Sequence, residues 1–519
     1  MKMVKSLLLG TATGFAMIAG AQAADLPGKA APAEYVRICD TYGAGFFFIP
    51  GTDTCLRIGG FVRADYSLYV PRTSNIQATA GTSVGGSPVP GTNLSRAAFD
   101  NDSAFQSRFA LNFDARSNTE YGLLRGFAQF TIRRGESSGL LGSGVNNGSN
   151  GNPRMTLAVM DRAFIQFAGF TFGYTASFFN FYQGDVSILA GGQPTVTRAH
   201  ATNLLAYTAS FGQGFSATVS LEDRRTQEVT NLDQTAAGTA AVVGGTGAVA
   251  ATLGLRPFSG LYGLTYGPQA LPDVVLNLRV DQGWGSAQLM GAVRQIKDYG
   301  YAGVVSTAAG TAPTAAAGDR YGWAIGGGIR INLDQIARGD VLWLQAVYSD
   351  GALSYVINNA NSDGINANRN NTSGPFNYSQ AGGVVFNYRD AAVVGAGGAA
   401  PSFAAGGSIQ TTQAWGIAAG FRHFWTPNVR SSIFGSFANV NAPLASTLPD
   451  FRIWTVGANV IWSPVRNLDI GLEMVYGNSS RTGANSGAVA TTGAVTNANG
   501  TIKSSDANLL TTLRVQRNF

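Results

Sequence analysis

The chain has 519 residues, of which 45% are hydrophobic, 11% aromatic and only 12% charged. Because disordered chains are rich in charge and poor in aromatic residues, this composition excludes a disordered protein, and the low charge also excludes a coiled coil. The formal net charge is +6, but Lys and Arg are scattered singly rather than clustered as a phosphate backbone requires, so no nucleic acid partner is expected.

Residues 1–23 have the features of a secretory signal peptide. Lys2 and Lys5 precede an apolar stretch, residues 7–20, and Ala21-Gln22-Ala23 follows as the small-x-small pattern that a signal peptidase cuts. The apolar stretch is shorter than the roughly twenty residues that cross a bilayer as a helix, which leaves a retained anchor as the alternative. We expect the mature chain to begin at Ala24 and to fold outside the reducing cytosol.

The two cysteines of the chain, Cys39 and Cys55, lie in the first part of the mature sequence. A disulfide between them would close a loop of about fifteen residues and stabilise it by roughly 3 kcal/mol. A zinc site is an alternative, although two thiols without a nearby histidine do not fill four ligand positions. Two free thiols are the other alternative. We expect the disulfide, within an N-terminal periplasmic segment of residues 24–55.

From residue 56 to the end, the chain repeats segments in which apolar and polar residues alternate with a period of two. In residues 104–116, for example, Phe105, Phe109 and Leu111 share one face, while Arg108, Asn112 and Asp114 share the other. Such segments are typical of a transmembrane β-barrel. We predict sixteen strands near residues 56–69, 104–117, 120–133, 156–168, 170–177, 203–211, 214–223, 272–281, 284–296, 321–333, 340–350, 412–424, 428–440, 451–462, 467–477 and 507–519.

The connections between these strands alternate between short and long. This alternation indicates an all-β, antiparallel barrel over residues 56–519, with tight periplasmic turns and long external loops. The connection at residues 350–411 is unusually long, and residues 384–388 within it could add a hairpin, so eighteen strands is the alternative count. Phe519 ends the last strand, and we expect this terminal aromatic residue to act as a signal to the outer-membrane insertion machinery.

Several stretches of the chain are similar to one known family. Residues 24–27 read ADLP and residues 39–60 read CDTYGAGFFFIPGTDTCLRIGG, with weaker matches at residues 161–170, 205–212 and 514–519. On these residues the chain resembles the alphaproteobacterial porin family over essentially its whole mature length. The Ala/Thr/Gly-rich insertions at residues 236–253 and 395–407 are longer than the resemblance leads us to expect.

The resemblance implies a function and an assembly. It implies a homotrimeric pore for passive diffusion of small hydrophilic solutes and ions across the outer membrane. It also implies a third external loop, here about residues 176–203, that folds inward as a constriction. The expected partners are identical subunits, outer-membrane lipid and lipopolysaccharide, the insertion machinery and the solutes themselves. No cofactor is expected.

The period of two also identifies charged residues that should face the lumen near mid-membrane. On the first four strands these are Arg63, Arg108, Arg125 and Arg162, and the acidic candidates are Asp65, Asp114 and, in the third loop, Asp185. A basic wall facing acids would bias the ions that pass. Alternatively, these arginines pair locally with the acids. Asp161 and Arg162 are adjacent, so a β-bulge or a buried outer face is needed to keep one of them out of lipid.

Other readings of the chain are less well supported by its residues. Neither His200 nor His423 belongs to a catalytic arrangement. Gly326-Gly327-Gly328 lies within a predicted strand and not in a phosphate-binding loop, and small residues there would permit a bend or close packing. We therefore expect a porin and not an enzyme or a metal protein. The alternatives are a substrate-specific channel, an adhesin-like or receptor barrel whose loops bind a partner, and a secreted soluble β-protein.

Overall fold

The structure of the chain is a computed structural model. It describes residues 37–70, 75–77, 93–95, 103–136, 154–188, 201–223, 271–297, 305–307, 310–312, 319–357, 390–394, 408–443, 450–482, 495–496 and 505–519. The predicted signal peptide lies outside the described residues. The chain divides into two compact units, Met1–Arg57 and Ile58–Phe519.

The described part of the first unit is a small loop closed by a disulfide. A 3-10 turn (η1, Asp40–Tyr42) and a two-residue strand (β1, Phe47–Phe48) lie between the cysteines, and β1 pairs antiparallel with the first residues of the next strand. Cys39 is bonded to Cys55, so the predicted disulfide is confirmed. The bridge is buried against Phe46 and forms a core of its own.

The second unit is a closed ring of sixteen antiparallel strands, as predicted. In ring order the strands are β2 (Cys55–Val70), β5 (Ser103–Thr119), β6 (Gly122–Glu136), β7 (Arg154–Phe167), β8 (Phe170–Ala176), β9 (Ala201–Gly212), β10 (Phe215–Glu222), β11 (Asp273–Gln282), β12 (Gly285–Lys297), β15 (Asp319–Asn332), β16 (Val341–Asp350), β19 (Gln413–Thr426), β20 (Val429–Asn441), β21 (Asp450–Val465), β22 (Leu468–Thr482) and β24 (Ser505–Asn518). All sixteen predicted segments are strands of this ring.

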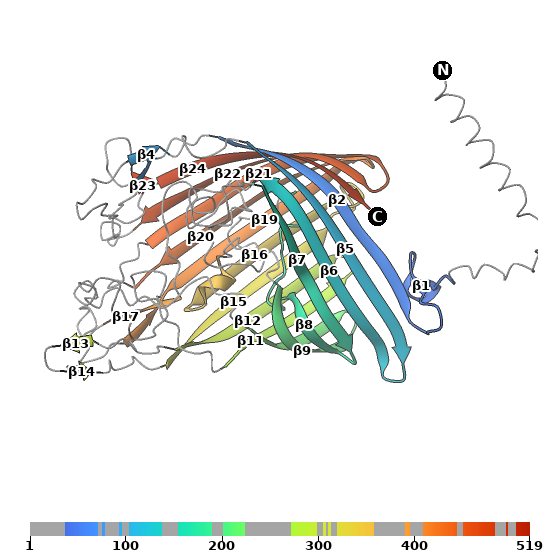
Figure 1. Cartoon of the computed structure of the whole chain (residues 1–519), viewed down its shortest axis with the longest axis horizontal. Helices are drawn as coiled ribbons and strands as arrows, with labels where there is room; N and C mark the ends of the chain where they lie inside the picture. Colours follow the sequence, from blue (N-terminus) through green and yellow to red (C-terminus); the bar gives the residue numbers. More distant parts are fainter. Residues whose placement is uncertain are drawn as a thin grey trace, which may run out of the picture. The chain divides into compact units, whose positions relative to one another are not determined.

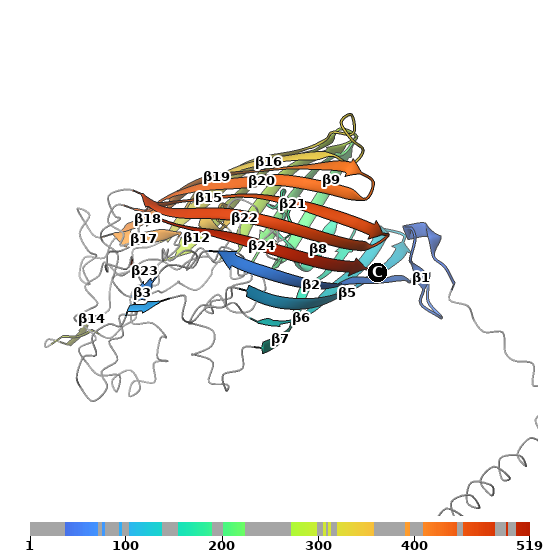
Figure 2. The ribbon, with the colours of Figure 1, turned by 90° about the horizontal axis from the view of Figure 1, so that it is seen from above.

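The ring closes where the last strand meets the first. Strand β24 pairs with β22 on one side and with β2 on the other, from Phe61 opposite Asn518 to Val70 opposite Leu509. Gly60 and Phe519 exchange two backbone hydrogen bonds of 3.1 Å across this seam. Figures 1 and 2 show β2 (blue) lying beside β24 (red). Closure pairs the edges that an open sheet would expose to lipid.

The alternation in each strand is inverted relative to a water-soluble barrel. In β21, Trp454, Val456 and Val460 are exposed on the outer face, while Thr455 and Asn459 are each 3% exposed on the inner face. The outer side of the ring is thus apolar, whereas the inner side combines polar residues with apolar ones that pack against the inward-folded loops. A β-barrel surrounded by lipid has this arrangement.

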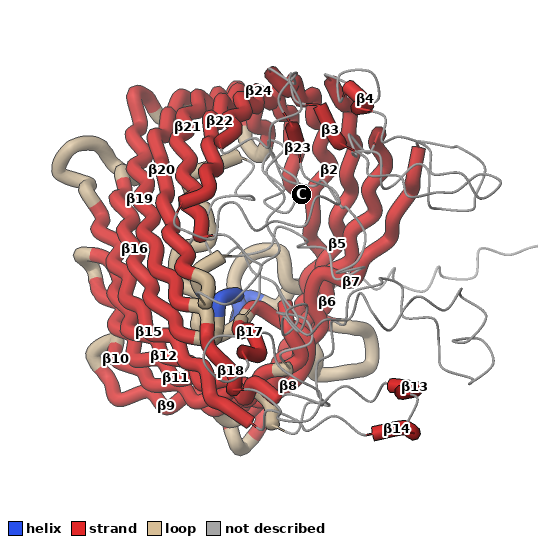
Figure 3. Tube along the Cα trace, turned by 90° about the vertical axis from the view of Figure 1, so that its left-hand side faces the viewer, coloured by secondary structure: helices blue, strands red, loops and turns tan. Residues whose placement is uncertain are grey.

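Two external connections fold into the interior of the ring. Loop 3, here meaning residues 177–188 after β8, and the loop 6 segment, residues 351–357 after β16, together with wall residues form a continuous buried core. Its fully buried members include Phe179, Leu353 and Ile357. Figure 3 shows the 3-10 turn of the loop 6 segment (η5, Leu353–Tyr355, blue) inside the ring of strands. The inward fold of the third loop, predicted from the family resemblance, is confirmed for residues 177–188, and residues 189–200 of the predicted loop lie outside the described residues.

Short additional strands form separate sheets that are not part of the ring. They are β13 (Val305–Thr307) with β14 (Gly310–Ala312), β17 (Ala391–Val394) with β18 (Ser408–Thr411), and β23 (Val495–Thr496) with β3 (Asn75–Gln77) and β4 (Asn93–Ser95). Residues 384–388, the possible extra hairpin, lie outside the described residues, and the ring itself has sixteen strands. Within the described chain, no helix is long and apolar enough to cross a membrane.

Candidate functional site: the interior of the barrel

Loop 3 is held against the inner wall by hydrogen bonds from wall side chains to its backbone. The carboxylate of Glu222 on β10 accepts from the amide of Phe178 (3.0 Å), and Asn277 on β11 donates to the carbonyl of the same residue (2.7 Å). Further along, Gln345 on β16 accepts from the amide of Tyr182 (2.8 Å). Because these buried polar side chains have loop backbone as partners, loop 3 needs no secondary structure of its own.

Inward-facing glycines make room for the large side chains of loop 3. A Cβ atom on Gly328 would lie 2.2 Å from the ring of Phe181, and one on Gly420 would lie 2.4 Å from the hydroxyl of Tyr182. One on Gly471 would lie 2.6 Å from Ile188. These three glycines on β15, β19 and β22 form a track for the loop. Of the glycines predicted to permit close packing in β15, Gly328 faces loop 3, and Gly326 is close to Val347 and Met290 of the neighbouring strands.

The far end of loop 3 is bound to a buried carboxylate. Glu473 on β22 is fully buried and accepts from the hydroxyl of Ser187 (2.8 Å), the amide of Ile188 (2.6 Å) and the amide group of Asn459 (2.8 Å). Arg514 on β24 donates to the carbonyl of Ile188. Loop 3 is therefore fixed along the wall from β10 to β24.

The loop 6 segment is held by a buried ionic cluster. Arg294 on β12 lies 2.6 Å from Asp273 and 3.0 Å from Asp390, and none of the three side chains is more than 4% exposed. Tyr355 donates to Asp273 (2.9 Å), and Asp390 accepts from the amide of Leu353 (2.8 Å). Burial raises the pKa of the Asp390 carboxyl and of the Tyr355 hydroxyl above their usual values. The Tyr355 ring also contacts that of Phe179, so this cluster supports loop 3 as well.

The arginines and acids predicted on the first strands form shared ion pairs on the inner wall. Asp65 lies between Arg63 (3.4 Å) and Arg514 (2.7 Å). Asp114 lies between Arg116 and Arg125, each of which makes two bonds of 2.9 to 3.0 Å to it. The structure thus brings Arg125 to Asp114 and Arg63 to Asp65. Arg116 and Arg514 were not among the predicted site residues.

A β-bulge accounts for the adjacent Asp161 and Arg162. Gln129 on β6 lies opposite Arg162 and Phe130 lies opposite Met160, so Asp161 is an extra residue without a partner in the register. Both charged side chains therefore fall on the inner face, where Thr131 and Gln129 donate to Asp161. Arg108 lies 3.4 Å from the same carboxylate. Of the two explanations left open by the sequence, the structure shows the bulge.

Asp185 lies on loop 3 rather than on the wall and is exposed. It lines a cavity of about 180 Å³ together with Arg422 on β19, Arg430 on β20 and Arg514 on β24. The structure therefore places Asp185 near a second group of arginines and not against Arg63, Arg108, Arg125 or Arg162. Among the described residues, no group of three or more His, Cys, Asp or Glu side chains is placed to hold a metal ion.

Comparison with known proteins decides the family. A family profile described as a porin subfamily matches residues 24–507. The chain belongs to this porin subfamily. It is 36% identical over 221 residues to porin Omp2b of Brucella canis, a match covering 42% of this chain and 54% of that protein, and 36% identical over 222 residues to Omp2b of Brucella melitensis. The chain thus spans about half the length of the curated relatives it matches.

Solved structures to which this porin is similar have low sequence identity to it. The outer membrane channel DcaP of Acinetobacter baumannii is 15% identical, with a TM-score of 0.47 over 91% of this chain and 99% of that chain. OmpT of Vibrio cholerae is 9% identical, with a TM-score of 0.43 over 91% of this chain and 99% of that chain. The family and the apolar outer face place this porin in the bacterial outer membrane, which its strands cross.

Aromatic rings lie among the lumenal arginines of this porin. Phe127 on β6 lies directly opposite Asp114 on β5 and Phe164 on β7. Directly opposed residues share a face of the sheet, so both phenylalanines are on the inner face, with ring centroids 5.2 Å apart. The guanidinium of Arg125 lies 5.2 and 5.4 Å from the two ring centroids. Phe61 is similarly placed, 5.4 Å from the guanidinium of Arg63. Such cation–π contacts hold the arginines in place. Phe127 is two residues after Arg125 on the same strand, so the alternation of the sequence already places its ring on the lumenal face beside Arg125.

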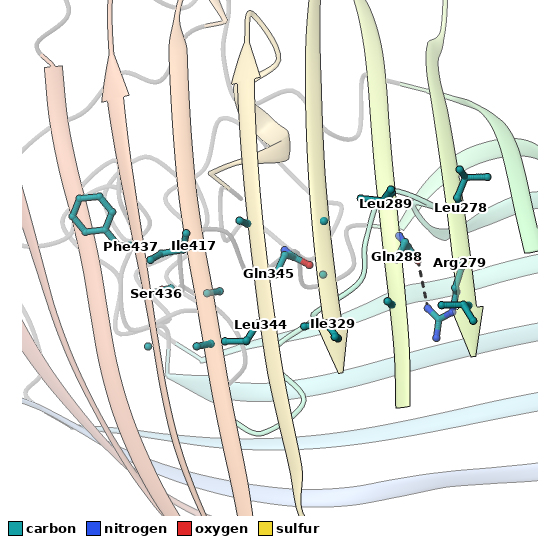
Figure 4. Close-up of a pocket in the computed structure, with 18 of the residues that line it drawn as sticks. Leu278, Arg279, Gln288, Leu289, Ile329, Leu344, Gln345, Ile417, Ser436 and Phe437 are labelled. Carbon is teal, nitrogen blue, oxygen red and sulfur yellow. Dashed lines mark hydrogen bonds between the residues drawn. The ribbon is translucent and has the colours of Figure 1, made fainter. Parts of the chain in front are cut away.

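The outer face of this porin carries an apolar hollow of about 1100 Å³. Figure 4 shows Leu278, Leu289, Ile329, Leu344, Ile417 and Phe437 on six adjacent strands from β11 to β20. Gly327 pairs with Ala346, and Ala419 with Gly435, so small residues on adjacent strands form its floor. On the opposite side of this wall, loop 3 packs against Gln288 and Gln345. The wall is thus covered by protein inside and offers an apolar surface outside.

Proposed function

We propose that this porin forms a passive diffusion channel for small hydrophilic solutes and ions across the outer membrane. The observation that carries the proposal is loop 3, which is bonded to the β10–β24 side of the ring and narrows the interior beside the charged wall of β2 and β5–β7. A polar, narrowed barrel interior lets small solutes pass without energy input. Such a porin acts as a channel and not as an enzyme.

The wall formed by β2 and β5–β7 carries more arginines than acids among its described residues. Asp65 and Asp114 are each shared by two guanidinium groups. Arg330 and Arg422 form no ion pair with any described residue and lie instead on the rings of Trp343 and Phe424. Charged walls of one sign raise the local concentration of the opposite ion. The proposal therefore includes a preference for anions, to which Arg63, Arg108, Arg125 and Arg162 contribute.

The proposed assembly is a homotrimer within lipid and lipopolysaccharide. It is supported by the family resemblance, as is a role of Phe519 in recognition by the insertion machinery. Residues 24–55 would be a periplasmic segment that carries the disulfide. Migration of the unheated protein at three times the mass of the heated protein on a gel would support the trimer, and cross-linking that stops at two subunits would contradict it.

A substrate-specific channel is the second candidate, and the rings of Phe61, Phe127 and Phe164 on the lumenal face favour it. Aromatic tracks bind the apolar faces of particular solutes. Liposome-swelling rates for uncharged sugars separate the two candidates. Rates that fall smoothly with sugar size support general diffusion, and entry restricted to one solute class supports the specific channel.

Neutralising three wall arginines tests the proposed function. In a planar bilayer under a salt gradient, the wild-type reversal potential is expected to show anion preference. Replacing Arg63, Arg108 and Arg125 with Gln should shift it toward cations, because Asp65 and Asp114 then keep one guanidinium each and Asp161 loses Arg108. The matched control replaces Arg338, Arg466 and Arg517, three exposed arginines at or near turns, and should change the reversal potential less. An unchanged preference in the wall variant would contradict the assignment.

A further inference from the structure

The cavity beneath the end of loop 3 has the chemistry of a binding site. Its volume is about 180 Å³, and it lies between residues 185–188 of loop 3 and the inner face of β19–β24. Arg422, Arg430, Ser432 and Arg514 line it from the wall. The charge of each of these residues, and the hydrogen bonds each already makes, decide what could bind.

Two adjacent donors in this cavity have no acceptor. Arg422 and Ser432 lie directly opposite each other in the β19–β20 register, and Ser432 is only 5% exposed. Within the described part of the chain, neither Nε of Arg422 nor Oγ of Ser432 has a hydrogen-bond partner. A buried donor without an acceptor carries a desolvation cost. An oxygen-rich ligand would accept from both groups at once.

The other two arginines of the cavity are already paired, and Asp185 of loop 3 forms no ion pair with Arg422, which leaves Arg422 able to bind an anion. Arg430 lies 2.8 Å from Asp469, and Arg514 is bound to Asp65 and to the carbonyl of Ile188. Arg422 makes no ion pair with a described residue and contacts the ring of Phe424 at 5.5 Å. It lies diagonally across from Arg430 on the neighbouring strand. Like charges on adjacent strands are destabilising, and a bound anion relieves that repulsion.

We propose that this cavity binds a small oxyanion, with phosphate as the representative ligand, through the guanidinium of Arg422 and the hydroxyl of Ser432. Guanidinium groups bind phosphate and carboxylate oxygens with paired N–H donors, and a hydroxyl supplies a further donor. The exposed Asp185 of loop 3 lines the cavity, so an oxyanion bound there would add negative charge beside the passage and lower the anion current. This inference rests on the proposed channel and assigns it a preferred class of solute.

Inorganic phosphate is the probe for the test. Single-channel current is recorded in KCl while phosphate replaces chloride at constant ionic strength. The wild type is expected to show a saturable fall in conductance. Ser432→Ala, which changes no charge, should raise the half-saturating phosphate concentration about tenfold, and Arg422→Gln should raise it further. Arg279→Gln is the matched control, because it removes one inner-wall arginine outside this cavity and should leave the phosphate effect in place.

A second measurement does not depend on conduction. Phosphate is expected to raise the unfolding temperature of the detergent-solubilised wild-type protein, since a ligand that binds only the folded state stabilises it, and this rise should shrink in Ser432→Ala. A channel that conducts normally, with equal phosphate effects in wild type and Ser432→Ala, would overturn the site and leave the proposed function intact. Absence of conductance together with a retained thermal shift would overturn the proposed function and leave the site.

Asp185 provides a test of opposite sign. Its exposed carboxylate lines the same cavity and repels an anion. Asp185→Asn is therefore expected to lower the half-saturating phosphate concentration several-fold while the loop stays bound through Glu473. Weaker phosphate binding in this variant would show that the anion does not bind where we place it.

Discussion

Replacing Arg294 with Met is expected to destabilise the folded barrel by about 3–5 kcal/mol, the cost of removing one partner from a buried ion pair. The guanidinium of Arg294 forms ion pairs with Asp273 at 2.6 Å and with Asp390 at 3.0 Å, and all three side chains are buried. Its loss leaves two buried carboxylates without a cation. Because Asp390 also binds the amide of Leu353, the loop 6 segment should detach from the wall.

The effect of this substitution should depend on pH. Burial already raises the pKa of Asp390, and loss of the guanidinium removes a group that lowers it. The variant should then fold with Asp390 protonated. A group whose pKa is raised in the folded state favours folding at low pH, and this contribution is lost as the pH rises through the folded-state value. The penalty relative to wild type is therefore expected to be smaller at about pH 4 than at about pH 8, where an unpaired carboxylate must be buried.

Urea unfolding of the detergent-solubilised protein, followed by tryptophan fluorescence, measures this difference. The control is Arg279→Met, which breaks a pair with Asp281 whose partners are 36% and 53% exposed. Exposed pairs are worth about 1 kcal/mol or less, so this variant should unfold close to the wild-type midpoint. Equal midpoints for the two variants would show that the Arg294 cluster does not hold the interior together.

Replacing Glu473 with Ala is expected to change the channel current. Ser187, Ile188 and Asn459 would each lose the fully buried carboxylate of Glu473 as an acceptor, at about 1–3 kcal/mol for a buried donor left unsatisfied. The end of loop 3 should then leave β22 and move into the passage beside β2 and β5–β7. We expect the steady open-channel level to be replaced by flickering between levels.

Single-channel recording distinguishes this release of the loop from general instability. Glu473→Gln keeps a side-chain oxygen as acceptor and should restore part of the steady current. Asp450→Asn is the matched control, since its carboxylate holds the amide of Ala442 in a different external connection. A current as steady as that of wild type in Glu473→Ala would mean that the glycine track alone keeps loop 3 in place.

The sequence predicted the ring well because each strand carries its own signal. Alternation with a period of two, bounded by turn residues, is local information, and it located the sixteen ring strands. The same alternation showed which residues face inward, including Arg63, Arg125 and Asp114. It does not show which strands are neighbours in space or at what height their residues meet, so Arg514 beside Asp65, which lies 449 positions away, could not be predicted.

Other features of the interior were missed for definable reasons. The loop 6 segment has no periodicity, and its buried position depends on Arg294 and Asp390, which lie far apart in the chain. The bulge at Asp161 was one of two explanations that the sequence left open, because a bulge breaks the period that was used to find lumenal residues. Phe127 and Phe164 are apolar residues on a polar face, and they are stabilised there by the stem and guanidinium of Arg125. Prediction from the alternation within one strand fails at these places because contacts between side chains of several strands determine the structure there.

Arg514 belongs both to the seam of the ring and to the docking of loop 3. Its guanidinium bonds Asp65 on the first ring strand at 2.7 and 2.9 Å and also reaches the carbonyl of Ile188. Arg514 can bond Asp65 and Ile188 together only after β24 has paired with β2. During biogenesis, closure of the ring therefore comes before the full set of Arg514 bonds to the wall and to loop 3. A half-inserted chain lacks the finished narrow passage, and the passage is completed in the same step that removes the last open strand edge.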